Sequence, residues 1–219
     1  MEKNNYTFKI SENYQLFFAL CLISLLVGEA SKYFLDTNAL MYASFSEKLT
    51  PEQLENMFEQ NAKWIMIGYL AIPLFYFLKT HFIAGILGLG SIMFNKEVSH
   101  KKLWNIVLKA EMIFIVVVIA KTLWFLFVQT SYTFEELQGF YPLSLVNLIS
   151  TESIDPWYLY PLQVVNVFEI LYWVILAVLI NQSIKEPKLA TSFKIVATSY
   201  GPALLIWVVG VMFFTLNIT

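Results

Sequence analysis

Five long apolar stretches alternate with polar stretches along this chain. They cover about residues 15–34, 64–93, 104–128, 157–181 and 193–216. A helix of about 20 apolar residues is long enough to cross the hydrocarbon core of a bilayer. The pattern therefore predicts an all-α membrane protein, with a bundle of about five transmembrane helices in a single transmembrane domain over residues 1–219.

Two of these stretches leave alternatives open. The first is also compatible with a signal peptide, because Gly28 and Ala30 form a small-x-small cleavage pattern; we interpret it as the first transmembrane helix. The second contains Pro73 and the polar triplet 79–81. It is therefore either one tilted or kinked helix or two helices that separate near Lys79. Each half is short for a separate crossing, so we predict one crossing.

A short helix is expected in each of the two polar loops that follow the first and the third apolar stretches. Thr50 and Gln53 have the spacing of a capping box, with Pro51 at the first helical position, and this helix is expected to run directly into the second span. Thr133 and Glu136 repeat the same spacing. The apolar segment 140–148 is too short to cross, and we expect it to lie in the interface or to tuck back onto the bundle.

Lysines predict the orientation in the membrane. They gather before the first span and in the loops at residues 95–102 and 181–194, whereas the other two loops are predominantly acidic. Cytoplasmic loops are rich in lysine and arginine. Five crossings with a cytoplasmic N-terminus and an external C-terminus place every lysine cluster on the cytoplasmic side.

Composition agrees with a membrane protein. Of the 219 residues, 58% are hydrophobic and only 14% are charged. A soluble domain has about 25% charged residues, so this chain has too little polar material to cover a surface that faces water. The net charge of −2 argues against nucleic acid as a partner, and the single Cys21 excludes an internal disulfide.

Ionisable side chains inside the apolar stretches are the candidate functional residues, because an ionisable group at membrane depth is energetically expensive. Glu111 cannot face Lys109, since positions two apart on a helix point to different sides. It needs a partner on another helix, or a proton. Lys121 is expected to reach the outer surface with its long side chain.

A polar stripe is predicted on the fourth span, where Gln163, Asn166 and Glu169 recur at steps of three. A stripe of this kind should face the interior of the bundle. One interpretation is an interhelical bond network, or a buried pair of Glu169 with Lys121 or Lys79. The other is a proton- or solute-binding site at the midplane of the membrane.

Other chemistry is weakly indicated. Pro202 removes the hydrogen bond to the carbonyl of Thr198, so we expect a kink there, with the Thr198 and Ser199 hydroxyls compensating. His81 and His100 stand apart from other metal-ligating residues in the sequence, and no phosphate loop or nucleophile motif is present. We therefore predict no catalytic residues, no metal site and no cofactor.

Two segments carry a resemblance to a known family. A basic loop enters the third span with Ser99-His100-Lys101-Lys102-Leu103-Trp104-Asn105-Ile106, and the last span opens with residues 193–202, which end in Ser199-Tyr200-Gly201-Pro202. Over about residues 95–219 the chain resembles bacterial members of the Yip family of small multi-span membrane proteins. The resemblance implies a five-helix fold and a non-enzymatic role in a bacterial cytoplasmic (inner) membrane. Eukaryotic members look like partners of small GTPases. We do not expect this chain to have their long N-terminal region, so that partner is not carried over.

Three functional hypotheses follow. The first is a Yip-like protein that acts by association with membrane lipid, with other membrane proteins or with itself. The second is a small transporter or permease subunit with a polar site around Glu169. The third is an intramembrane enzyme. A dry and paired Glu169 favours association, whereas a water-accessible cavity that reaches Glu169 favours transport.

Overall fold

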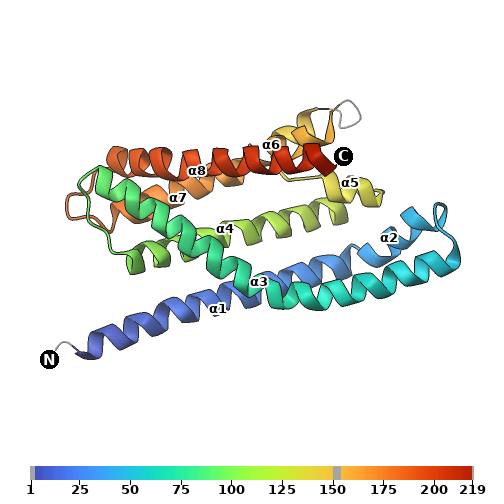
Figure 1. Ribbon diagram of the computed structural model, residues 1–219, viewed down its shortest axis with the longest axis horizontal. Helices are drawn as coiled ribbons and strands as arrows, with labels where there is room; N and C mark the ends of the chain where they lie inside the picture. Colours follow the sequence, from blue (N-terminus) through green and yellow to red (C-terminus); the bar gives the residue numbers. More distant parts are fainter. Residues whose placement is uncertain (1–2, 150–153, 219) are drawn as a thin grey trace.

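The computed structural model describes the backbone of residues 3–149 and 154–218 and the side chains of residues 12–149 and 154–217. Within these residues the chain is all-α, as predicted, and contains one isolated β-bridge. Figure 1 shows the helices running back and forth along one axis. Their bounds are α1 Lys3–Phe34, α2 Thr37–Ser46, α3 Pro51–Met93, α4 His100–Phe127, α5 Phe134–Gly139, the 3₁₀ helix η1 Leu145–Leu148, α6 Pro156–Val164, α7 Val167–Asn181 and α8 Leu189–Ile218.

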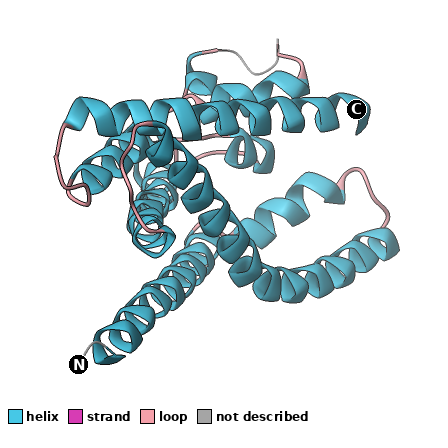
Figure 2. Ribbon diagram, turned by 60° about the vertical axis from the view of Figure 1, so that its left-hand side comes forward, coloured by secondary structure: helices cyan, strands magenta, loops and turns pink. Residues whose placement is uncertain are grey.

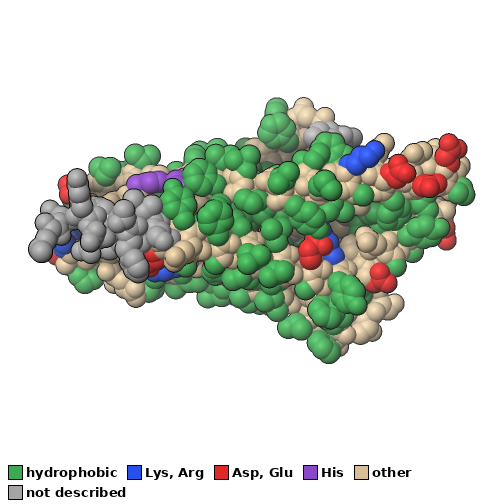
Figure 3. Space-filling model, turned by 90° about the horizontal axis from the view of Figure 1, so that it is seen from below, with side chains coloured by type: hydrophobic (Ala, Val, Ile, Leu, Met, Phe, Trp, Pro, Cys, Tyr) green, Lys and Arg blue, Asp and Glu red, His purple; other side chains and the backbone are tan. Residues whose placement is uncertain are grey.

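Four of these helices are long and apolar enough to cross a membrane. They lie within α1, α3, α4 and α8, and α7 is a shorter apolar helix. In Figure 1, α1 begins at one end of the bundle and α8 finishes at the other. Large hydrophobic side chains remain exposed along the length of the bundle. The face in Figure 3 is mostly hydrophobic, and acidic side chains gather at the end where α2 and the start of α3 lie.

Both capping boxes form as the sequence predicts. The Thr50 hydroxyl accepts a bond from the backbone N–H of Gln53, whose side chain accepts one in return from the backbone of Thr50. Thr133 and Glu136 make the same reciprocal pair at the start of α5. These bonds satisfy backbone N–H groups that have no partner within the helix.

Helix α3 is continuous from Pro51 to Met93, so the helix predicted from Thr50 does run into the second apolar stretch, and no break occurs near Lys79. Polar residues in the middle of α3 are tolerated because each finds a partner. The buried Thr80 hydroxyl accepts a bond from Trp104 Nε1 at 3.0 Å. The ring of His81 bonds to the carbonyl of Phe77 at 3.0 Å.

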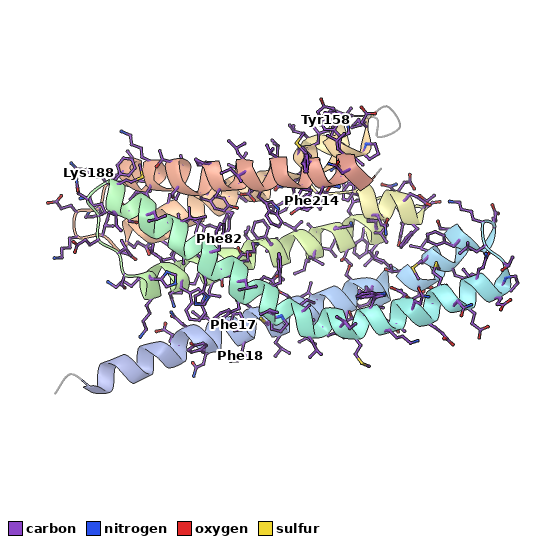
Figure 4. All side chains as sticks on the ribbon, in the orientation of Figure 1. Phe17, Phe18, Phe82, Tyr158, Lys188 and Phe214 are labelled. Atoms are coloured by element: carbon purple, nitrogen blue, oxygen red, sulfur yellow. The ribbon has the colours of Figure 1, made fainter. Side chains whose placement is uncertain are left out.

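Helix α4 is the centre of the bundle. It packs against α1, α3 and α7, while α8 packs against α3, α6 and α7. Figure 2 shows the first half of α3 diverging from α8 toward α2. On α1, Phe17 points into the bundle and is 6% exposed, whereas Phe18 points away (Figure 4) and is 65% exposed. The alternation marks the side of α1 that the core covers.

Helices α3 and α8 approach each other closely at Gly90 of α3. A Cβ atom at this position would lie 2.7 Å from both Cβ and Oγ of Ser199 on α8. Ser199 bonds its own helix, through the carbonyl of Ile195 at 2.6 Å, so its hydroxyl is already oriented along α8. Glycine is required here because α3 and α8 come too close for a larger side chain.

The predicted fourth span is wrong in one respect. Residues 157–181 do not form one helix, because α6 ends at Val164 and α7 begins at Val167. Asn166 is extended, with φ −143° and ψ 163°, and forms an antiparallel bridge with Ser144. The backbone N–H of Leu145 donates to the carbonyl of Val165 at 3.1 Å. The segment 140–148 therefore tucks back onto the bundle, one of its two expected placements, and fills the break.

Helix α8 continues through Pro202 to Ile218. The hydroxyls of Thr198 and Ser199 donate to the carbonyls of Lys194 and Ile195. They do not bond the carbonyl of Thr198 that Pro202 leaves without its usual donor, so the expected compensation is wrong. A hydroxyl on a helix reaches the carbonyl four residues before it, which is why these two serve a different turn. The kink itself stays a prediction.

Candidate functional site

A buried ion pair joins α3 to α4. Lys79 Nζ lies 2.8 Å from Glu111 Oε2, and the Glu111 side chain is only 1% exposed, whereas that of Lys79 is 33% exposed. The ammonium group also lies 4.9 Å from the centre of the Phe114 ring. Glu111 thus has a partner on another helix, which is one of the two possibilities that the sequence left open, and this partner is Lys79.

The second oxygen of Glu111 is also occupied. The hydroxyl of Tyr172 on α7 donates to Glu111 Oε1 at 3.0 Å, and Tyr172 is fully buried. A carboxylate held by an ammonium group and a phenolic O–H is compensated on both oxygens, which a buried charge needs. Three helices, α3, α4 and α7, meet at this carboxylate.

Glu169 is placed differently. It lies in the first turn of α7, next to the break, and is half-buried. The hydroxyl of Tyr200 on α8 donates to its Oε1 at 2.9 Å, and Trp173 Nε1 donates to the same oxygen at 3.0 Å. These donors are neutral, so the expected direct pair of Glu169 with Lys79 or Lys121 is wrong: Lys79 bonds Glu111 instead.

The two carboxylates belong to one cluster. The rings of Tyr172 and Tyr200, which bond Glu111 and Glu169 respectively, lie edge to face with their centres 5.4 Å apart. We refer to these six side chains as the carboxylate cluster: Lys79, Glu111, Glu169, Tyr172, Trp173 and Tyr200. It spans α3, α4, α7 and α8 and contains two acids and one base.

The predicted polar stripe does not exist as one helical face, because the break separates its members. Gln163 lies in α6 and its side-chain amide donates to the carbonyl of Gly139 at 3.1 Å. Asn166 is the N-cap of α7, and its Oδ1 accepts from the backbone N–H of Glu169 at 2.8 Å. Its amide group donates to the carbonyls of Gln163 and Val164. Asn166 therefore holds the break in place instead of facing a solute.

Lys121 lies outside the carboxylate cluster. It is ten residues beyond Glu111 on α4, about 15 Å along the helix axis. The Lys121 side chain is half-buried, and among the described residues it forms no hydrogen bond and no ion pair.

Three aromatic members of the cluster were not predicted from the sequence. Tyr172 and Trp173 follow Glu169 by three and four residues, which places all three on one side of α7. Tyr200 was named only as part of the family-like pattern that opens the last span. The spacing of Tyr172 and Trp173 from Glu169 was the one sequence signal for the cluster, because a buried tyrosine hydroxyl or tryptophan N–H usually has a hydrogen-bond partner.

The segment 140–148 approaches Glu169 from the loop side. Burial raises the pKa of Tyr141 to about 12, and the nearby carboxylate of Glu169 adds to the increase. The Tyr141 carbonyl accepts bonds from Ser144 and Asn147. Leu143 in this segment has φ 53°, a conformation that is unfavourable for a bulky residue. The segment is therefore held in place by bonds on both sides of a strained residue.

The two histidines, which are far apart in the sequence, lie close together. Their ring centres are 5.6 Å apart, and His81 also lies 4.2 Å from the ring centre of Trp104. Among the described residues no group of three or more His, Cys, Asp or Glu side chains is arranged to hold a metal ion.

The fold and the carboxylate cluster define a class, an all-α protein whose apolar helices suit a multi-pass membrane protein. Comparison with known proteins takes the identification no further: no protein-family model, no curated protein and no solved structure matches the chain. The Yip-like resemblance therefore stays a prediction.

Proposed function

We propose that this chain is a multi-pass membrane protein of the Yip type that acts by association with lipid or partner proteins in a bacterial cytoplasmic membrane, without catalysis. One observation carries the proposal. The two deep carboxylates bond to side chains of the protein itself: Glu111 to Lys79 and Tyr172, Glu169 to Tyr200 and Trp173. Such a network stabilises the bundle in the way interhelical polar bonds do in membranes.

The outer surface supports the same proposal. Helix α3 exposes large apolar side chains on several sides over its middle part, including Trp64 at 68%, Leu70 at 78% and Leu74 at 61%. An apolar surface of this extent suits contact with lipid chains or with another apolar helix. The helices that carry it are the ones that are long enough to cross a bilayer.

The test is the isosteric change Glu169→Gln. If association is the function, the variant keeps its fold and its bound species, because glutamine retains an oxygen that accepts from Tyr200 and Trp173. Gentle-detergent purification followed by native mass spectrometry of the wild type and the variant measures what stays bound. A reproducible protein or lipid on both supports the proposal, and its loss from the variant alone overturns it.

A second candidate function, a small transporter or permease subunit, is favoured by the break between α6 and α7. Broken helices whose N-terminal ends point into a bundle are used by transporters to bind solutes and ions. Glu169 lies at such an end, in the first turn of α7. On this hypothesis Glu169→Gln abolishes solute or proton movement in proteoliposomes while the fold survives. Unchanged movement in the variant excludes this use of Glu169.

The proposed orientation has its own test. Single cysteines at Lys101 and at Glu135, in a Cys21→Ser background, should react with a membrane-impermeant maleimide from opposite sides of the membrane. Lys101 lies in the lysine-rich region predicted to be cytoplasmic, and Glu135 lies in α5 at the other end of the bundle. Labelling of both from the same side excludes five crossings.

A further inference from the structure

We propose that a basic cavity at the lysine-rich end of the bundle binds the phosphate headgroup of an anionic phospholipid. This inference rests on the proposed function, because it requires this end to lie at the cytoplasmic surface of a membrane. The cavity has a volume of about 390 Å³ and lies where the start of α4 meets α1 and the end of α7. None of the carboxylate cluster lines it.

The charge of the cavity suits an anion. Among the described side chains that line it are Lys101, Lys102 and Lys109, and Glu12 is the one acid among them. Lys102 and Lys109 are both exposed and stand seven residues apart on α4, so they project from the same face two turns apart. The first turn of α4 adds backbone N–H groups with a partial positive charge.

Neutral donors complete the lining. The amide of Asn105 lies between Lys102 and Lys109 on the same face of α4, and Gln182 lines the cavity from the end of α7. Lysine ammonium groups with amide donors around them are groups that bind phosphate oxygens in proteins. The lining therefore has the chemistry of a phosphate site.

The side of the cavity toward α1 is held rigidly. Asn13 of α1 is only 4% exposed. It accepts a bond from Asn105 Nδ2 at 2.8 Å and donates one to the backbone carbonyl of Lys101 at 3.0 Å. These two bonds fix α1 against the start of α4, so the lysines project from a frame that exists before a ligand arrives. A preformed frame reduces the ordering that binding requires.

An apolar track below the lysines indicates a lipid and not free phosphate. The face of α4 that carries Lys102 and Lys109 continues toward the other end of the helix with apolar residues only, which are exposed or half-buried: Ile113, Val116, Ala120 and Leu123. A phosphate group held by the lysines thus leaves room for acyl chains along this face. Basic pockets between transmembrane helices at the cytoplasmic side are suited to anionic headgroups.

The experiment measures lipid binding by native mass spectrometry of the full chain in detergent. Phosphatidylglycerol and phosphatidylcholine with identical acyl chains are titrated onto the wild type and onto Lys102→Gln/Lys109→Gln. A lysine near a membrane surface strengthens binding of anionic lipid about fivefold, so the double variant should bind phosphatidylglycerol roughly 25-fold more weakly. Its binding of phosphatidylcholine should be unchanged.

The matched control is Lys185→Gln/Lys188→Gln. It removes the same charge from the same end of the molecule, where Lys188 lies in the loop before α8 (Figure 4), but neither residue lines the cavity. The control should bind phosphatidylglycerol like the wild type. An equal loss in both double variants indicates general attraction to charge and overturns the proposal, as does equal binding of the two lipids by the wild type.

Competition with inorganic phosphate distinguishes a site for a lipid headgroup from a site for a free phosphate ion. Inorganic phosphate should not displace phosphatidylglycerol at millimolar concentration, because the acyl chains contribute to binding; displacement there identifies a free-anion site and overturns the lipid proposal. Failure of the cavity proposal can be distinguished from failure of the proposed function. A protein that keeps its partner through Glu169→Gln but shows no preference for phosphatidylglycerol refutes only the cavity proposal.

Discussion

Removing Lys79 should be the most damaging single change to the buried ion pair. In Lys79→Met the Glu111 carboxylate, 1% exposed, keeps only the bond from Tyr172. Breaking a buried pair by removing one partner costs about 3–5 kcal/mol. Because the Lys79 side chain is itself 33% exposed, the lower end of this range applies, and we expect the free energy of unfolding to fall by about 3 kcal/mol.

Removing the acid of the ion pair should cost less than removing the base. In Glu111→Gln the remaining oxygen still accepts from Tyr172, and Lys79, which is 33% exposed, can extend its ammonium group away from the core. We expect a loss of about 1–2 kcal/mol. The double variant Lys79→Met/Glu111→Gln contains no charge at this point and should be more stable than Lys79→Met alone.

Unfolding by sodium dodecyl sulfate in mixed micelles measures all four proteins of this cycle. Lys79→Met should show the largest loss of the three variants, because it leaves the Glu111 carboxylate buried without its cation. Lys121→Met is the control, since Lys121 lies outside the cluster. A loss in Lys79→Met below about 1 kcal/mol refutes the reasoning.

Three further predictions concern the break, the close contact at Gly90 and the loop that carries Tyr141. Asn166→Ala removes the N-cap of α7 and should lower the free energy of unfolding by about 1–2 kcal/mol in the same assay. Gly90→Ala places a methyl group 2.7 Å from Ser199 and should cost about 1–3 kcal/mol; Gly85→Ala, with no atom within 4 Å of the new Cβ, should be neutral or stabilising, and equal losses would contradict the close contact. The pKa of Tyr141 is raised to about 12, above its ordinary value of 10, so its contribution to stability is full below pH 10 and is lost as the pH rises toward 12. Tyr141→Phe should flatten the fall in stability over that window, and an unchanged slope argues against burial of the phenol.

Local patterns were predictable from the sequence, and contacts between helices were only partly so. The capping boxes at Thr50 and Thr133 depend on side chains three residues apart, which any sequence displays directly. That Glu111 needs either a partner on another helix or a proton also follows from its own helix. The identity of Lys79 as this partner depends on where α3 crosses α4, and no spacing within one helix contains that information.

The break at Asn166 shows why one spacing supports two structures. Asn166 and Glu169 are three residues apart, which places them on one side of a helix but is equally the distance between an N-cap and the third residue of a new helix. The sequence prediction used the first meaning, and the structure has the second. Only the bonds from residues 143–145, distant along the chain, decide between them.

These same bonds imply an order of events in biogenesis. Taken alone in a bilayer, residues 157–181 are expected to remain one unbroken helix, because lipid offers no partner for an open backbone. The carbonyl of Val165 and the N–H of Val167 are free to leave helical bonding only when Leu145 and Leu143 are in place to receive them. Docking of the loop onto the inserted bundle therefore comes first or together with the break. Secondary structure at this point is a product of assembly, and a chain in which the loop is cut or displaced should revert to a single straight crossing.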